Sequence, residues 1–434
     1  MPADDGPGRA QPTGGAQPAG GAQRAADAQA VRSARPGGER LRLLLGAFGD
    51  PGHAFPTIAL GRALVARGHE VVLQTWRRWE EHVEAEGMRF APAPEYHVFP
   101  TLERPLSPYQ AVVRAVHDTR PLIAETRPHA VVADILTLAP ALAGELEGIP
   151  VATLIPHTDP RGAPGFPPYS IGARLPRTAA GRRLWQATDR VVAGGLERGR
   201  RELNETRARL RLPPLAHPHG GISRELCLVA TFPQLEYPRA WPPGTHVVGP
   251  LLWEPAAGDV APPPGDGPLV LVAPSTSQDR GRRLLRAALE GLDGLPVRVL
   301  ASTDRSAPDR PAGVTGNARL VDWVPYARAM PRCDVVVCHA GHGTIARALE
   351  AGCVPVCVPA AGDMNETSAR VDWAGAGVRL PRRLCRPTPV RLAVRRALAE
   401  PGLRARAREL AAWAATHDSG ARAAELVEAF AAGR

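Results

Sequence analysis

A glycine-rich turn between a strand pattern and a helix pattern carries the clearest chemical signal in this 434-residue chain. It reads Cys338-His339-Ala340-Gly341-His342-Gly343-Thr344 and opens a helix pattern over Ile345–Glu350. Small residues let backbone N–H groups approach a ligand, and a helix N-terminus favours an anion, so the turn fits a diphosphate. His339 is placed to donate a further hydrogen bond. Such turns are also common as plain connections, so these residues alone leave both interpretations open.

Other phosphate and metal chemistries fit this turn less well. It lacks the Gly-Lys-Ser/Thr of a Walker loop, and no GxGxxG follows the first strand pattern, which argues against a dinucleotide enzyme. A zinc site can be drawn from Cys338, His339, Cys353 and Cys357, but these residues lie in apolar strand-like runs. None of the six cysteines is spaced as CxxC, and we expect buried thiols and no metal.

A second candidate is His53, which the pattern places in a loop, Gly49–Pro56, just before a helix. An alcohol becomes a good nucleophile only as its proton is removed, and a histidine whose pKa is near neutrality suits that task. Asp134, at the end of a strand pattern, and Asp50, in the same loop, are acids that can assist. A lone histidine is also common at surfaces and helix caps, so its type alone does not assign it a role.

The elements that must position these residues alternate between strand and helix patterns. Strand patterns occur at 42–46, 70–73, 130–134 and 150–154, and again at 269–272, 297–300, 334–338 and 354–358. Strand–helix–strand units build parallel sheets, which bind ligands at the carboxyl ends of their strands. We therefore predict an α/β protein with two Rossmann-like domains facing across a cleft.

The predicted organisation has five parts. They are a low-complexity, disordered tail over 1–38, an N-terminal Rossmann-like domain over 39–252, a Pro/Gly-rich linker over 253–268, a C-terminal Rossmann-like domain over 269–400, and a long amphipathic C-terminal helix within 401–434 that packs back. An Arg-rich helix pattern also runs from about 182 to 210.

Four segments together resemble the nucleotide-sugar signature of the UDP-glycosyltransferase superfamily, whose fold is called GT-B. They are Asp322–Pro325, His339–Thr344, Pro359–Asp363 and Ala369–Val371, and their order, spacing and context all agree. The similarity extends over roughly residues 40–430 and points to bacterial, actinobacterial-type natural-product glycosyltransferases.

The resemblance implies that the N-terminal domain, 39–252, binds the acceptor and that the C-terminal domain, 269–400, binds the nucleotide sugar. It also implies a role for each matching residue. His53 is the general base that deprotonates the acceptor, and Asp134 orients it, although some relatives place a catalytic acid at the position of Asp50. Trp323 and Val324 pack on the nucleobase, and Asp363 binds sugar hydroxyls. The expected donor-binding residues are Ser275, Thr276, Trp323, Val324, His339, Gly341, Gly343, Thr344, Asp363 and Met364.

The chain departs from the family pattern at three positions. Met364 replaces the usual Gln, Thr367 replaces an Asn, and Ala340 replaces a Gly. Met364 cannot hydrogen-bond a sugar hydroxyl as an amide does, so we hypothesise a donor that lacks a hydroxyl. The alternative is that Asn365 or Glu366 supplies those hydrogen bonds and the donor is UDP-glucose.

We therefore expect an inverting, metal-independent glycosyltransferase that moves a sugar from a UDP- or dTDP-sugar to a hydroxyl of a small hydrophobic natural product. The nucleotide sugar is a co-substrate, and no separate cofactor is expected. Acceptor loops are expected at 92–110 and 159–180, whose aromatic residues are Tyr96, Phe99, Tyr109, Phe166 and Tyr169. The alternatives are a sugar-nucleotide epimerase, a silent helper of a partner transferase, and a lipid-linked cell-wall transferase whose helix 182–211 touches membrane.

The composition of the chain argues against several other classes of function. The formal net charge is +10, but all 53 basic residues are Arg and are interspersed with acids, so we expect no nucleic-acid partner. The Arg, 47 Pro and 44 Gly reflect a GC-rich codon bias. No apolar run reaches the ~18 residues of a membrane span, and the N-terminus does not resemble a secretion signal. We expect a cytoplasmic protein, monomeric or homodimeric.

Overall fold

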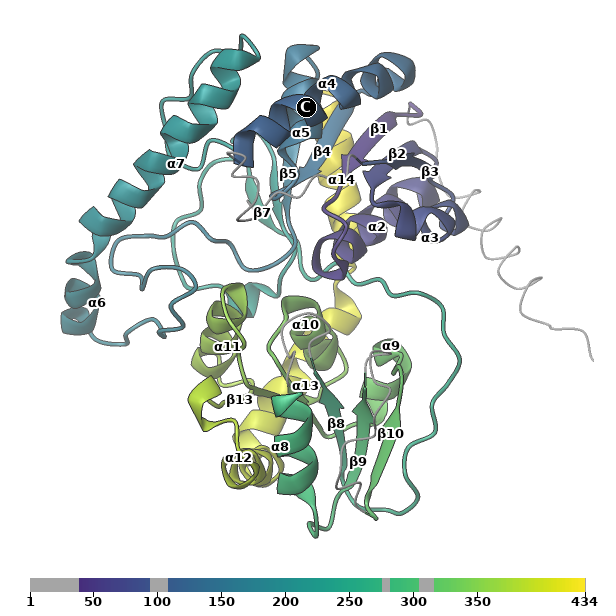
Figure 1. Ribbon diagram of the computed structural model, residues 1–434, viewed down its shortest axis with the longest axis vertical. Coiled ribbons are helices and arrows are strands. Elements are labelled where there is room, and N and C mark those ends of the chain that lie inside the picture. The colour runs from purple at the N-terminus through teal and green to yellow at the C-terminus, as the bar shows by residue number, and fades with distance from the viewer. Residues whose placement is uncertain (1–38, 94–107, 275–281, 304–315, 434) are drawn as a thin grey trace, which may run out of the picture.

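The computed structural model describes residues 39–93, 108–274, 282–303 and 316–433, which form two α/β domains, each built around one parallel sheet (Figure 1). Ser275, Thr276, Tyr96 and Phe99 lie outside the described residues. The predicted two-domain α/β fold is confirmed.

The N-terminal sheet has seven strands in the order β3-β2-β1-β4-β5-β6-β7, all paired in parallel. Its strands are β1 (Arg42–Gly46), β2 (Glu70–Thr75), β3 (Arg89–Pro92), β4 (Ala130–Asp134), β5 (Val151–Ile155), β6 (Cys227–Val229) and β7 (Thr245–Val247). Its helices are α2 (Pro51–Ala66), α3 (Glu80–Ala85), α4 (Pro108–Thr126), α5 (Leu138–Leu146), α6 (Ala179–Gln186) and α7 (Asp189–Arg209), with short 3-10 turns at Arg77–Trp79 and Pro233–Leu235.

The C-terminal sheet has six parallel strands in the order β10-β9-β8-β11-β12-β13. Its strands are β8 (Leu269–Ala273), β9 (Arg298–Ser302), β10 (Ala318–Val321), β11 (Val335–Cys338), β12 (Val354–Cys357) and β13 (Val378–Arg379). Its helices are α8 (Arg283–Leu292), α9 (Tyr326–Ala329), α10 (His342–Glu350), α11 (Asp363–Trp373), α12 (Pro387–Ala399) and α13 (Pro401–Thr416), with 3-10 turns at Met330–Arg332 and Arg382–Leu384.

The central strands are buried because helices cover both faces of each sheet. Every residue of β4, β8, β11 and β12 is buried, which is why these strands read as continuous apolar runs rather than alternating ones. Strand β11 pairs with both β8 and β12, so its end at Cys338 and the turn that follows lie at the middle of the sheet edge.

Three predicted helices differ from the observed ones. Helix α2 begins at Pro51 rather than Pro56, so His53 lies in its first turn and not in a preceding loop. The N–H groups of His53 and Ala54 already bond the carbonyl of Asp50, and Pro56 forgoes only the one N–H bond to the carbonyl of Gly52. The Arg-rich pattern is interrupted near Thr188, whose hydroxyl donates to the carbonyl of Trp185, and so forms α6 and α7.

The C-terminal pattern is also two helices, because Asp418 starts a new one by accepting the N–H of Ala421. This last helix, α14 (Ser419–Ala431), leaves the C-terminal domain and packs beside α2 in the N-terminal domain (Figure 1). Its Ala423, Ala424 and Val427 are buried in the same core cluster as β1 and α2. The predicted return of the C-terminus is thereby confirmed.

Candidate functional site

The candidate base and its orienting acid meet at the carboxyl end of the N-terminal sheet. Asp134 is the last residue of β4, and His53 stands in the first turn of α2, which follows the neighbouring strand β1. The Nδ1 atom of His53 donates to Oδ1 of Asp134 at 2.8 Å, and Oδ2 of Asp134 accepts the N–H of Phe48 at 3.1 Å. The acid is fully buried while the imidazole is 17% exposed, so only the histidine faces outward.

This geometry prepares His53 to accept a proton. Burial of the ring acts to lower the pKa of His53, but the charge and hydrogen bond of Asp134 outweigh it and raise that pKa above its ordinary value, with smaller help from Asp363 and Asp50. Because Nδ1–H is committed to Asp134, Nε2 is the atom that takes the proton. Asp50, by contrast, has a side chain that is 60% exposed, with Arg78 at 3.6 Å.

A further histidine, His157, lies beside His53 and was not singled out from the sequence. It follows β5, the strand next to β4, and its ring packs edge-on against that of His53 with centroids 6.1 Å apart. Burial lowers the pKa of His157 against the opposing effect of its hydrogen bond to the Thr158 carbonyl, at 2.7 Å. The signal that could have found it is its position, two residues past the carboxyl end of a central strand.

The predicted diphosphate turn joins β11 to α10 as expected. His339 is buried, Ala340 adopts a left-handed backbone with φ of 61°, and Gly341 precedes the first turn of α10. The left-handed conformation at Ala340 is one that glycine adopts without a steric cost, which accounts for the glycine usual at that position in the family. Gly343 is exposed and Thr344 half-buried at the start of the helix, so its free N–H groups can hold an anion.

One residue of this turn reaches the other domain. The Nε2 atom of His342 donates to the carbonyl of Ala230, just past β6, at 3.3 Å. Burial lowers the pKa of His342 to about 3, so it is a neutral donor. The diphosphate turn therefore lies against the N-terminal domain.

The predicted sugar-binding acid, Asp363, is the first residue of α11 and is half-buried. Its charge acts on the pKa of both His53 and His157, so it lies near the candidate base although it belongs to the other domain. Met364 follows it, half-buried and packed on the core. Thr367, where the family has an Asn, is fully buried.

The remaining predicted site residues lie in different surroundings. Trp323 is half-buried, and Val324 is 1% exposed and packs within the core. Their contact with a nucleobase stays a prediction. Of the two acceptor loops, 94–107 lies outside the described residues, as does the Tyr109 side chain. In the other loop, Tyr169 approaches Nδ1 of His157 at 3.3 Å, and Phe166 packs on Tyr237.

The next observations concern the cysteines, the potential metal ligands and the helices of the described residues. All six cysteines are free and buried. Within the described ranges, no group of His, Cys, Asp and Glu side chains is arranged to hold a metal ion. No helix among the same residues has the length and apolar character needed to cross a membrane.

Two family descriptions match separate parts of the chain, one in each domain. Residues 43–153 match the glycosyltransferase family 28 N-terminal domain, and residues 286–430 match the erythromycin biosynthesis protein CIII-like C-terminal domain. The first match contains His53 and Asp134, and the second contains the diphosphate turn and α11.

Relatives match over most of the chain. The chain is 31% identical to 4'-demethylrebeccamycin synthase of Lentzea aerocolonigenes, over 89% of this chain and 99% of that one. It is 28% identical to O-mycaminosyltylonolide 6-deoxyallosyltransferase of Streptomyces fradiae, over 90% and 98%. Among solved structures, the glycotransferase of kitacinnamycin superposes with a TM-score of 0.72 at 21% identity, over 90% and 99%. The chain is thus a glycosyltransferase of the GT-B fold and belongs to the UDP-glycosyltransferase superfamily, among its actinobacterial natural-product members.

Proposed function

We propose that this glycosyltransferase is inverting and metal-independent, and that it moves a sugar from a UDP- or dTDP-linked donor to a hydroxyl of a small hydrophobic natural product. The observation that carries the proposal is the position of the His53–Asp134 pair. The two side chains lie 2.8 Å apart in the N-terminal domain. The charge of Asp363, at the start of α11 in the C-terminal domain, acts on the pKa of His53. A base and a sugar-binding acid on opposite domains suit a displacement between them.

The proposed reaction is one displacement step. The acceptor oxygen attacks the anomeric carbon as its proton passes to Nε2 of His53, and the bond from that carbon to the donor's diphosphate oxygen breaks. Asp134 stabilises the imidazolium that forms, as the acid of a hydrolase triad does. The leaving diphosphate's charge is met by the N-terminus of α10 and by His339, so the step needs no bound cation. Attack opposite the leaving group inverts the anomeric configuration.

The acceptor class is inferred from the loop between β5 and α6. This irregular segment, residues 156–178, places Tyr169 against His157 and Phe166 against Tyr237, and aromatic rings suit an apolar aglycone. Of the two relatives, one is named as a 4'-demethylrebeccamycin synthase and the other as an O-mycaminosyltylonolide 6-deoxyallosyltransferase.

The donor is proposed to be a deoxysugar. Met364 presents a thioether where the family has an amide, and each of the two residues that could replace that amide already makes one hydrogen bond elsewhere. Asn365 donates from Nδ2 to the carbonyl of Ser170 at 3.2 Å, and Glu366 is buried and accepts from Arg370 at 2.8 Å. One relative's name describes transfer of a 6-deoxyallosyl group, which supports the same class.

The test is a thermal-shift panel followed by product analysis. UDP and dTDP, with ADP as control, are added at about 100 times the dissociation constant, where a bound ligand adds ~2.7 kcal/mol of stability. No shift with any of them would contradict a nucleoside diphosphate site. With an accepted donor and aglycone, NMR of the product reads the anomeric configuration, and turnover is repeated with EDTA. Retention of the anomeric configuration would contradict the inverting mechanism. Loss of activity with EDTA would contradict metal independence.

A further inference from the structure

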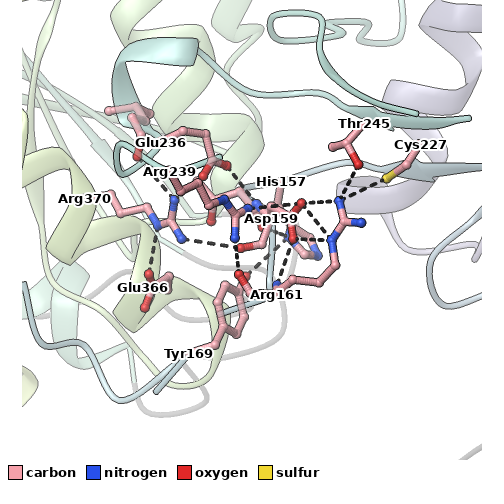
Figure 2. Close-up of polar contacts among 12 residues, drawn as sticks. His157, Asp159, Arg161, Tyr169, Cys227, Glu236, Arg239, Thr245, Glu366 and Arg370 are labelled. Carbon is pink, nitrogen blue, oxygen red and sulfur yellow. Dashed lines mark hydrogen bonds and ion pairs between the residues drawn. The ribbon is translucent and has the colours of Figure 1, made fainter. Parts of the chain in front are cut away.

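A buried ionic network joins the two domains beside the candidate site. It consists of Asp159, Arg161, Glu236 and Arg239 from the N-terminal domain with Glu366 and Arg370 of α11, and we call it the interdomain network (Figure 2). Arg370, Glu366 and Glu236 have side chains only 3–4% exposed, and that of Asp159 is fully buried. The proposed chemistry assigns none of these residues a role.

Arg370 is the group through which α11 enters this network. Its Nε donates to Glu366 of its own helix at 2.8 Å, while Nη1 donates to Glu236 and Nη2 to the backbone carbonyl of Asp159, at 3.4 Å. Its guanidinium also lies over the ring of Tyr237, 4.5 Å from the centroid. Three of these four partners belong to the N-terminal domain, so Arg370 links the domains rather than bracing α11 alone.

On the N-terminal side the network continues into the loop that follows β5. The other oxygen of Glu236 accepts the N–H of Asp159 at 2.8 Å. The Asp159 carboxylate is in turn held by Arg161 at 2.5 Å and by Arg239 at 3.1 Å. Asp159 is two residues from His157, so the segment beside the candidate base is fixed by these contacts, as Figure 2 shows.

The same loop contacts α11 at two further points. The amide of Asn365 donates to the carbonyl of Ser170, and Arg174 pairs with Asp372 at 3.1 Å. A Cβ on Gly172, whose φ is 75°, would lie 3.1 Å from the Cβ of Asn365, so the backbones approach closely there. The loop and the helix therefore form one packed unit across the domain boundary.

We propose that Arg370 is a positioning residue that sets the sugar-binding end of α11 relative to the His53–His157 pair. Asp363 and Arg370 share one helix, seven residues apart, and a rigid helix transmits an anchor at one point to its other end. The proposal rests on the proposed transfer reaction, which requires the anomeric carbon and the acceptor oxygen to meet within about 3–3.5 Å. A buried ion pair is weak evidence of added stability, so a role in alignment explains its presence better.

The experiment compares two arginines that are equally buried. Arg207 is 3% exposed and pairs at 2.5 Å with Glu145, whose side chain is 40% exposed. Both lie in the N-terminal domain, so Arg207→Met is the control for losing a buried arginine and its ion pair within one domain. Arg370→Met is expected to lower kcat by about 10²-fold, the cost of a displacement of roughly 1 Å. The dissociation constant for the nucleoside diphosphate alone should stay within about twofold, because α10 and not α11 holds it. Arg207→Met should leave kcat unchanged.

A second variant and a second readout guard against loss of folding. Glu236→Gln keeps the size of the side chain and an acceptor oxygen, and it should lower kcat in the same direction by a smaller factor. Hydrogen exchange, which needs no activity, should show faster exchange over residues 159–175 in Arg370→Met and not in Arg207→Met. Unchanged exchange there, or unchanged kcat in both network variants, would overturn the positioning role. A wild-type protein that transfers no sugar refutes the proposed function instead, while the exchange measurement still decides whether Arg370 couples the loop to α11.

Discussion

The two oxygens of Asp134 hold the imidazole of His53 and the backbone of Phe48 at the same time, at 2.8 and 3.1 Å. The acid therefore fixes both the ring and the chain segment that leads into α2. Since its side chain is fully buried, this arrangement excludes water from the side of the pair opposite the substrate.

Replacing His53 by Ala should abolish transfer, with a loss of at least about 10²-fold in kcat, because no other group takes the acceptor proton at that place. The affinity for UDP or dTDP should hardly change, since the diphosphate turn lies in the other domain. Initial-rate kinetics and calorimetry with the diphosphate alone provide the two measurements. More than about a tenth of the wild-type rate would remove His53 from the role of base.

Asp134→Asn should change the pH dependence as well as the rate. The charge of Asp134 raises the pKa of His53, which must be neutral to act, so activity falls as pH drops through that raised value. In the variant burial acts without this opposing charge, the pKa of His53 falls, and the acidic limb of kcat/KM moves to lower pH while the plateau drops by about tenfold or more. An acidic limb that does not move would show that another group controls the profile.

His339→Ala should weaken binding of the nucleoside diphosphate itself by ~1.5–3 kcal/mol, the value of a hydrogen bond to a charged group. His339 is buried directly after β11, where a side chain can reach a phosphate held by α10. Calorimetry with the diphosphate, without sugar or acceptor, decides. Equal affinity in the two proteins would exclude His339 from the phosphate site.

Met364→Gln should shift donor preference toward fully hydroxylated sugars. A sugar hydroxyl desolvated against a thioether without a partner costs about 1–3 kcal/mol, whereas a missing hydroxyl costs nothing there. The rates of turnover with UDP-glucose and with a dTDP-deoxyhexose, measured on one accepted aglycone, give the donor preference of the wild type and of the variant. A wild-type preference for UDP-glucose that persists in the variant would defeat the deoxysugar proposal.

Glu428→Gln tests how α14 is held to the N-terminal domain. Glu428 accepts from Arg67 at 2.6 and 2.7 Å and from His69 at 2.7 Å, with 19% of its side chain exposed. Loss of its charge should reduce the free energy of unfolding by ~1–3 kcal/mol. Glu425→Gln, on the same helix but 50% exposed, should change it by less than about 0.5 kcal/mol. Thermal unfolding measures the free energy of unfolding of both variants. Equal changes in the two would show that the contact of Glu428 with Arg67 and His69 contributes little to stability.

The sequence predicted the central strands well because they are buried on both faces. The run of β11, for example, carries three consecutive valines, as is typical of a parallel strand buried on both faces. Strands β6 and β7 have three residues each, and every residue of β7 is only half-buried, so their patterns are too short to recognise. The start of α2 was misplaced because Pro56, a common first-turn residue, lies inside this helix.

The site was predictable where motifs determine it and not where distant loops meet. The pairing of His53 with Asp134 followed from a resemblance that spans both residues. Arg370 was noted only as part of a motif, and its partner Glu236, 134 positions away, sits in a segment without periodicity. His157 also lies in a segment without periodicity. No local sequence pattern indicates which other loop packs beside this residue.

The return of α14 to the N-terminal domain also bears on how the protein is made. Domains generally fold as units during synthesis, with the N-terminal one first. Here, however, the core around β1 and α2 includes Ala423, Ala424 and Val427 and is closed only after α14 has left the ribosome. Until then the side of α2 that α14 covers stays open while the second domain is translated. The N-terminal domain therefore begins to emerge first but is completed only after the C-terminal domain has been made.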